Sequence, residues 1–99
     1  MNFEYSPLAL RDLEKIQDDV WEVSRDFDIT ERYVNELMDK VEKKQEYPKS
    51  GHPVYNGDVF TGYYFVVYKA YLAFYYAKDD GIYIDRILPA KSDYLRVLL

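Results

Sequence analysis

The side chains that could do chemistry gather where the last predicted strand of this chain ends. That strand runs from Ile82 to Leu88 and contains Arg86, and Lys91 and Asp93 follow it closely. From Arg86 onward the chain carries three basic residues and one acid, a local charge of +2. Positive patches attract anionic groups, and side chains at a strand's end are held rigidly yet reach solvent. We therefore expect the functional site at this exit.

The remainder of the chain is acidic, which limits what this patch can bind. The 99 residues carry a net charge of −5, and residues 1–50 hold thirteen Asp and Glu against eight Lys and Arg. Residues 51–99 are neutral, with five residues of each sign. A uniformly acidic surface repels nucleic acid phosphates. Any anionic partner must therefore be recognised by local charge rather than by the overall field.

Composition and length exclude several classes of protein. The chain is long enough for one domain, which we assign to residues 1–99. It has no cysteine and a single histidine, His52, which argues against disulfides, metal centres and nucleophilic triads. We expect no cofactor. The N-terminal residues lack the pattern of a signal peptide and no apolar run could span a membrane, so we expect a cytoplasmic protein that does not enter the membrane.

Two amphipathic helices are expected to pack on the sheet and so to support the strand that carries the site. Ser6 suits a helix cap and Pro7 the first helical position. Asp28, with Glu31 three residues later, has the spacing of a capping box that begins a second helix. The apolar stripes of the two helices are Leu13, Ile16, Val20, Val23 and Phe27, then Val34, Leu37, Met38 and Val41.

The second half of the chain has the pattern of a small sheet. Residues 47–61 contain two prolines and two glycines and are predicted to form a long irregular connection. Strands are predicted over residues 62–69, 71–78 and 82–88, with a glycine-containing turn at 79–81. Asn2 to Tyr5 is a further short strand, and Ser92 could cap a final helical turn. The expected fold class is α+β: a small antiparallel sheet in β-α-α-β-β-β order, with the helical hairpin on one face.

In this order the elements resemble the RelE/ParE superfamily of bacterial toxins, also described as plasmid stabilisation proteins. The resemblance covers most of the chain. It is carried by Tyr5-Ser6-Pro7 through Ile16, by Pro48, Gly51 and Pro53, by Tyr71 to Tyr75, and by Ile84 through Asp93. The resemblance implies a growth-arresting toxin that is neutralised by a cognate antitoxin. It also implies that the toxin could form a homodimer, or a heterotetramer with the antitoxin. The antitoxin would wrap the helices and cover an edge or face of the sheet.

Within the superfamily two modes of action are known, and the resemblance leaves both open. RelE-like members cut messenger RNA on the ribosome, which needs a base, an acid and cations; ParE-like members bind and poison gyrase. The family commonly carries basic residues where Tyr64, Tyr76 and Pro89 align, and near Ser92. These departures favour the ParE-like mode. The alternatives are a ribosome-dependent mRNA endoribonuclease, that is, an mRNA interferase, and a non-toxic peptide-binding module.

The candidate residues for target binding each have a structural alternative. Arg86, which follows Asp85 in the strand, could form a cross-strand ion pair, and most tyrosines could be half-buried sheet residues. We assign no catalytic residue and no metal ligand. The candidates for contact with gyrase or with the ribosome and mRNA are Lys69, Arg86, Lys91, Asp93 and Tyr94.

Overall fold

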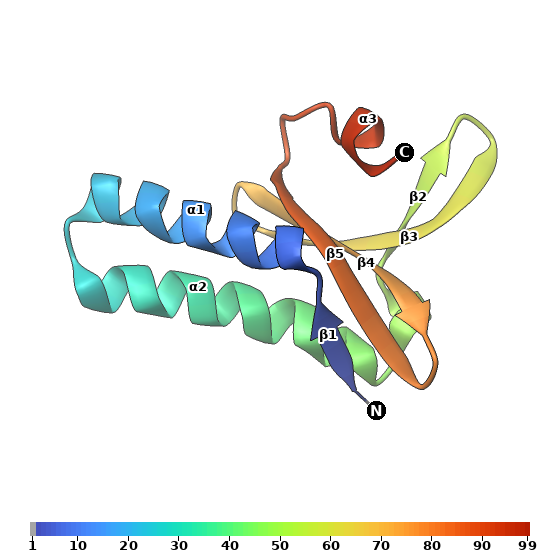
Figure 1. Cartoon of the computed structure of the whole chain (residues 1–99), viewed down its shortest axis with the longest axis horizontal. Coiled ribbons are helices and arrows are strands. Elements are labelled where there is room, and N and C mark those ends of the chain that lie inside the picture. Colours follow the sequence, from blue (N-terminus) through green and yellow to red (C-terminus); the bar gives the residue numbers. More distant parts are fainter. Residues whose placement is uncertain (1) are drawn as a thin grey trace.

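The computed structural model describes residues 2–99, which form a five-stranded sheet with helices on both faces (Figure 1). The elements are β1 (Phe3–Tyr5), α1 (Pro7–Ser24), α2 (Phe27–Glu42), the 3-10 turns η1 (Lys43–Gln45) and η2 (Pro48–Ser50), β2 (His52–Asn56), β3 (Val59–Tyr68), β4 (Tyr71–Lys78), β5 (Gly81–Pro89) and α3 (Tyr94–Leu98). None of the described helices is long and apolar enough to cross a membrane.

The sheet confirms the α+β class but is mixed rather than wholly antiparallel. Its strand order is β1-β5-β4-β3-β2. Strands β2 to β5 are antiparallel to their neighbours, whereas β1 runs parallel to β5. Short loops force antiparallel pairing only between consecutive strands. The partner of β1 is the last strand, so no short loop dictates its direction.

The strand β2 was missed by the sequence prediction, which left residues 47–61 irregular. β2 and β3 form a hairpin in which Asn56 lies opposite Val59, so Gly57 and Asp58 are the loop. Gly57 has a φ of 64°, which glycine adopts readily in a two-residue turn. Pro53 is tolerated because β2 is an edge strand, and the pairing shifts register between Pro53 and Tyr55.

Both helices have capped N-termini, as predicted, but the cap of the second helix lies two residues earlier than expected. The Ser6 hydroxyl accepts a hydrogen bond from the Ala9 amide and Pro7 is the first helical residue, as predicted. The second helix begins earlier than the Asp28 capping box indicated, because Asp26 caps it and accepts from the Ile29 amide. Only two residues therefore connect the helices.

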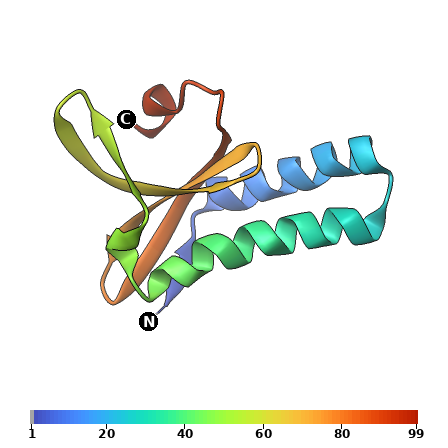
Figure 2. The same ribbon diagram turned by 180° about the vertical axis from the view of Figure 1, so that it is seen from behind.

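The helical hairpin covers one face of the sheet over only part of its length. Figures 1 and 2 show the connection between α1 and α2 extending well beyond the strands. Val23 and Phe27 lie at that far end and are 88% and 77% exposed, so the predicted apolar stripe is wrong there. The buried part of this core consists of Ala9, Leu13, Ile16, Leu37, Val41, Val66, Ala73, Tyr75, Ile82, Ile84 and Ile87.

A second, smaller core lies on the opposite face of the sheet. Its buried members are Val54, Leu72, Phe74 and Leu88. The C-terminal helix α3 packs on them through Tyr94, Leu95 and Leu98. Its N-cap is Asp93 instead of Ser92, whose hydroxyl donates to the Pro89 carbonyl.

The β4–β5 turn uses its glycine for space rather than for a positive φ. Lys78 lies opposite Gly81, so Asp79 and Asp80 are the loop, and Asp79 has a φ of 53°. A Cβ at Gly81 would overlap the carbonyl oxygen of Asn2. That oxygen accepts a hydrogen bond from the Ile82 amide at 3.0 Å, which helps to attach β1 to β5. Gly81 is therefore required where two strands approach closely.

We predict that Gly81→Ala destabilises the fold by about 1–3 kcal/mol, because the methyl group has no room beside Asn2. Denaturant unfolding would measure this loss, and amide exchange should show faster opening of β1. Gly57→Ala is the matched control: its position is open but has a positive φ, so it should cost about 1 kcal/mol and leave β1 protected. Unchanged β1 protection in Gly81→Ala would contradict the assignment.

Candidate functional site

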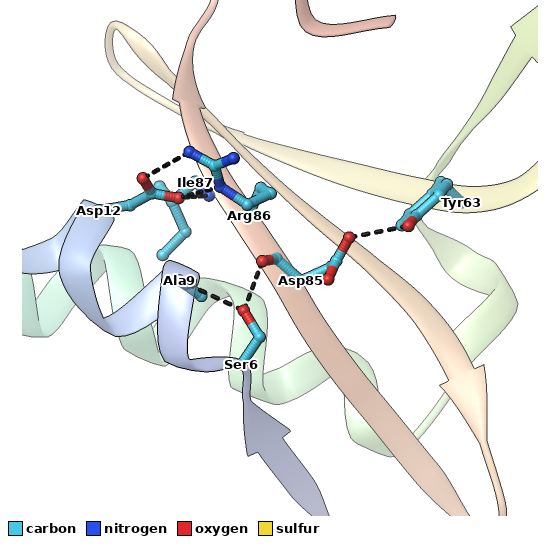
Figure 3. Close-up of polar contacts among 7 residues, drawn as sticks. All are labelled: Ser6, Ala9, Asp12, Tyr63, Asp85, Arg86 and Ile87. Carbon is cyan, nitrogen blue, oxygen red and sulfur yellow. Dashed lines mark hydrogen bonds and ion pairs between the residues drawn. The ribbon is translucent and has the colours of Figure 1, made fainter. Parts of the chain in front are cut away.

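The predicted site residue Arg86 is held by a carboxylate from the first helix. Its Nε and Nη2 donate to the two carboxylate oxygens of Asp12 at 2.8 and 3.0 Å (Figure 3). The Arg86 and Asp12 side chains are only 22% and 14% exposed. The hydrogen bond to Asp12 raises the pKa of Arg86 further above its ordinary value, and burial partly opposes this. Arg86 therefore forms an ion pair, but the expectation of a cross-strand partner is wrong, because the partner comes from α1.

The helix supplies Asp12 because the edge of β5 extends beyond β1. β1 pairs with β5 only as far as Ile84. Past that point the Ser6 hydroxyl donates to the Asp85 carbonyl at 2.6 Å, and the Ile87 amide donates to Asp12 at 2.9 Å (Figure 3). Unpaired backbone groups at a buried edge are costly. The first turns of α1 therefore provide the hydrogen bonds that a longer β1 would have made.

A β-bulge in β5 directs Asp85 toward the sheet face that carries α3. Phe74 pairs with Arg86 and Tyr75 with Ile84, so Asp85 is the extra residue. Its carboxylate accepts a hydrogen bond from the Tyr63 hydroxyl at 2.8 Å (Figure 3). Burial, together with this bond, raises the pKa of Tyr63.

Aromatic rings continue along this face beside Asp85. The Tyr63 ring lies 5.7 Å from that of Tyr76, and the Tyr76 ring lies 5.2 Å from that of Tyr83. The Lys78 ammonium lies 5.0 Å from the Tyr83 ring. All three rings are half-buried, as predicted for sheet tyrosines. They form a continuous aromatic cluster next to the bulge.

The other predicted site residues are not all directed to one place. Lys69 has a φ of 52° in the β3–β4 turn, and its ammonium lies 5.2 and 5.6 Å from the rings of Tyr33 and Tyr68 on the helix side. Lys91 is exposed in the segment after β5. The two turns are neighbours, because the Ala90 amide donates to the Ala70 carbonyl at 2.8 Å. The backbones of Lys69 and Lys91 are thus close, while the Lys69 side chain points to α2.

Asp93 and Tyr94 belong to the short C-terminal helix and serve it structurally. Asp93 pairs with Arg96 at 3.6 Å, and both side chains are mostly exposed. The Tyr94 ring lies 5.1 Å from that of Phe74 and packs on the smaller core. Tyr94 therefore fixes where α3 lies on the sheet.

The positions at which the family commonly has basic residues lie on different surfaces here. Tyr64 belongs to the helix side, where its ring stacks on that of Tyr75 at 5.7 Å. Tyr76 lies on the opposite face beside Tyr63. Pro89 ends β5 opposite Tyr71. Tyrosine at positions 64 and 76 therefore extends two aromatic packing arrangements.

Two sheet tyrosines, Tyr68 and Tyr75, have pKa values raised well above neutral pH. Burial raises the pKa of Tyr75 to about 12, an effect that a hydrogen bond from Gly51 partly opposes. Burial and a hydrogen bond to Glu36 raise the pKa of Tyr68 to about 12 as well. A base must lose its proton near the working pH, so neither hydroxyl has the property that general-base catalysis needs.

Sequence reasoning missed Ser6, in part, and Asp12 altogether. Ser6 was identified as a cap but its second bond, to Asp85, was not foreseen. Asp12 follows the pattern of a solvent-facing helix residue, one position before Leu13 of the apolar stripe. A carboxylate beside a buried stripe is the signal that could have indicated a bonded partner.

Comparison with solved structures shows a shared fold. A chain of the "Chromosomal ParDE TA system from P. aeruginosa" matches with a TM-score of 0.76 and 19% sequence identity, over 92% of this chain and 97% of that one. Comparison with curated protein sequences gives no significant match. The fold is therefore one found in a toxin–antitoxin system.

The sequence itself matches a family description over residues 3–94, "ParE toxin of type II toxin-antitoxin system, parDE". The chain belongs to the ParE toxin family, which lies within the superfamily that its element order resembled. It is the toxin component of a toxin–antitoxin pair, and its partner is a cognate antitoxin.

We predict that Asp12→Ala destabilises the protein by about 2–4 kcal/mol, because it leaves Arg86 and the Ile87 amide without their acceptor. The estimate is below that for a fully buried pair because both side chains keep some exposure. Asp19→Ala is the control, since its exposed pair with Lys15 should contribute less than about 0.5 kcal/mol. Equal midpoints of urea unfolding for the two variants would contradict the prediction.

We also predict that stability falls as the pH rises from about 10 to 12. The native pKa of Tyr75 is about 12, against 10.0 for the ordinary side chain, so above pH 10 the unfolded chain binds fewer protons than the native one. The contribution is complete below pH 10 and is lost as pH approaches the native pKa. Denaturant unfolding across this range would measure it. Tyr75→Phe should show a smaller fall, and an unchanged slope in that variant would contradict the assignment.

Proposed function

We propose that this toxin arrests bacterial growth by binding its target, in the manner of gyrase-binding ParE toxins, rather than by cutting RNA itself. The observation that carries the proposal is the pair between Arg86 and Asp12. Cleavage of RNA requires cations that stabilise charge on the phosphate as it forms. The arginine best placed at the end of the sheet is already neutralised and fixed by a carboxylate.

The acid and base that cleavage also requires are not supported by the described side chains. The raised pKa values of Tyr63, Tyr68 and Tyr75 keep these hydroxyls protonated at neutral pH. Asp85 accepts the Tyr63 hydrogen bond and is therefore engaged as well. A target-binding toxin needs a rigid surface and no proton transfer, which is what these bonds favour.

The target surface that we propose is the end of the sheet where β3–β4 and the exit of β5 meet. Lys91 supplies exposed positive charge there, and Lys69 supplies it at the adjoining helix side, where its ammonium lies over the rings of Tyr33 and Tyr68. Asp93 and Tyr94 act by holding α3 beside it, and Arg86 acts by holding β5 to α1. The five candidate residues thus divide into two that would contact the target and three that would position the surface.

The direct test is inducible production of the chain alone in bacteria, with incorporation of thymidine and of amino acids followed over the first minutes. We expect DNA synthesis to fall first, because the proposed target is gyrase. Co-production of the antitoxin should restore both. Early loss of protein synthesis would favour the ribosome-dependent endoribonuclease, and unaffected growth would favour the non-toxic binding module.

The proposed surface is tested by the double variant Lys69→Gln and Lys91→Gln, which should relieve toxicity while leaving the fold and antitoxin binding intact. Arg86→Ala is a poor test because it also breaks the pair with Asp12. The matched control is Lys15→Gln with Lys78→Gln, which removes the same charge from exposed pairs elsewhere. Full toxicity of the folded Lys69/Lys91 variant would reject this surface.

A further inference from the structure

A basic pocket lies where α2 ends, away from the proposed target surface. Its volume is about 320 Å³ and its lining includes three lysines, one aromatic ring and the loop before β2: Lys40, Lys43, Lys44, Tyr47, Ser50 and Gly51. The sequence analysis placed positive charge only after Arg86 and overlooked this cluster. It is a concentration of positive charge within the acidic half of the chain.

The ammonium groups of this pocket are not neutralised by the protein. Among residues 2–99, no carboxylate lies within ion-pair distance of Lys43 or Lys44. Lys40 donates to a neutral acceptor, the Val67 carbonyl. Three acids are near them in the sequence: Glu42 accepts a hydrogen bond from the Tyr5 hydroxyl at 2.7 Å, and Asp39 and Glu46 form no ion pair with these lysines within residues 2–99. Like charges that share a pocket repel one another, so an anion bound there would relieve that repulsion.

The far wall of the pocket is rigid. The Gly51 amide donates to the Tyr75 hydroxyl at 3.0 Å, and that hydroxyl donates to the Pro48 carbonyl at 2.8 Å. A Cβ at Gly51 would overlap the Tyr75 hydroxyl, so the loop lies as close to the core as it can. The His52 ring lies 5.1 Å from that of Phe65, where it packs on the sheet. The positive charge of the pocket therefore comes from the lysines.

Lysines at a helix C-terminus also interact favourably with the helix dipole. That dipole is equivalent to roughly half a negative charge, which is less than the charge of the three lysines that line the pocket. The acids of the same segment, Asp39, Glu42 and Glu46, do not line the pocket, so a ligand bound in it would contact the lysines. Lysine binds phosphate as a point charge, and a phosphate monoester carries a charge of about −1.5 to −2 at pH 7.

We propose that this pocket binds a phosphate monoester, with the phosphate between Lys43 and Lys44 and Lys40 nearby. The Tyr47 side chain is 74% exposed at the pocket and offers an apolar face to the organic part of such a ligand. Pockets for small ligands begin at roughly 300 Å³, so the space suits a sugar phosphate or a mononucleotide. The site is independent of the proposed target surface and of toxicity.

The test is a titration of the purified full chain, followed by amide chemical shifts, at constant ionic strength. The probes are inorganic phosphate, ribose 5-phosphate and a nucleoside 5′-monophosphate, with chloride and acetate as reference anions. We expect saturable shifts at Lys43, Lys44 and Gly51 for the phosphates only. The double variant Lys43→Gln and Lys44→Gln should weaken phosphate binding by roughly tenfold or more, because it removes two charge-assisted interactions.

The control Lys15→Gln with Lys78→Gln has the same net charge and should bind like the unmodified chain. Tighter binding of the nucleotide than of ribose 5-phosphate, lost in Tyr47→Ala, would identify a mononucleotide as the ligand; equal binding of the two would identify the sugar phosphate group. Shifts that follow ionic strength for every anion, or that persist in the Lys43/Lys44 variant, would overturn the proposal. If that variant only loses thermal stability, the lysines serve the helix and the proposal is wrong.

Discussion

Asp12 is the residue on which the geometry of the last strand depends. Its carboxylate accepts two hydrogen bonds from Arg86 and one from the Ile87 amide, so one side chain completes both a partly buried charge pair and the edge of β5 that β1 leaves unpaired. The constraint behind this arrangement is the shortness of β1, which pairs with β5 only as far as Ile84. Backbone groups beyond that point need partners, and the first turns of α1 are the nearest element that can provide them. The helical hairpin and the sheet are therefore joined by hydrogen bonds as well as by apolar packing.

Hydrogen bonds between distant segments also explain why a sheet so rich in tyrosine forms an ordered surface. Each long ring buries its apolar body and places its hydroxyl on a carboxylate or carbonyl: Tyr63 on Asp85, Tyr68 on Glu36 and Tyr75 on Pro48. Burial raises the pKa of all three hydroxyls, and the bonds to Asp85 and Glu36 raise the pKa values of Tyr63 and Tyr68 further. The bonds also fix the rings, so the hydroxyls are held in place and stay protonated at neutral pH. A surface built in this way is suited to holding a partner in one orientation. That property, rather than proton transfer, is what we propose the toxin uses.

The basic residues of this protein form local clusters, although its net charge is negative. Acids gather on the helices, yet the end of α2 holds lysines that no carboxylate within residues 2–99 pairs with, and the exit of β5 holds Lys91. The protein thus presents two basic places at different ends of its core. We assign one to the macromolecular target and the other to a small phosphate, because the second combines three lysines with a pocket of about 320 Å³.

The sequence by itself determined the elements whose signals are local. Ser6 and Pro7 indicated the start of α1, the apolar stripe through Leu37 indicated α2, and segments rich in aromatic and β-branched residues indicated β3 to β5. These signals depend on residues that are close together in the sequence. Only the tertiary structure decided the parallel pairing of β1, the exposure of Phe27, and the partner of Arg86. Each of these depends on contacts between segments far apart in the chain. Arg86 and Asp12, for example, are separated by 74 residues. A local sequence pattern cannot indicate which distant side chain will form hydrogen bonds with the part of β5 that β1 does not reach.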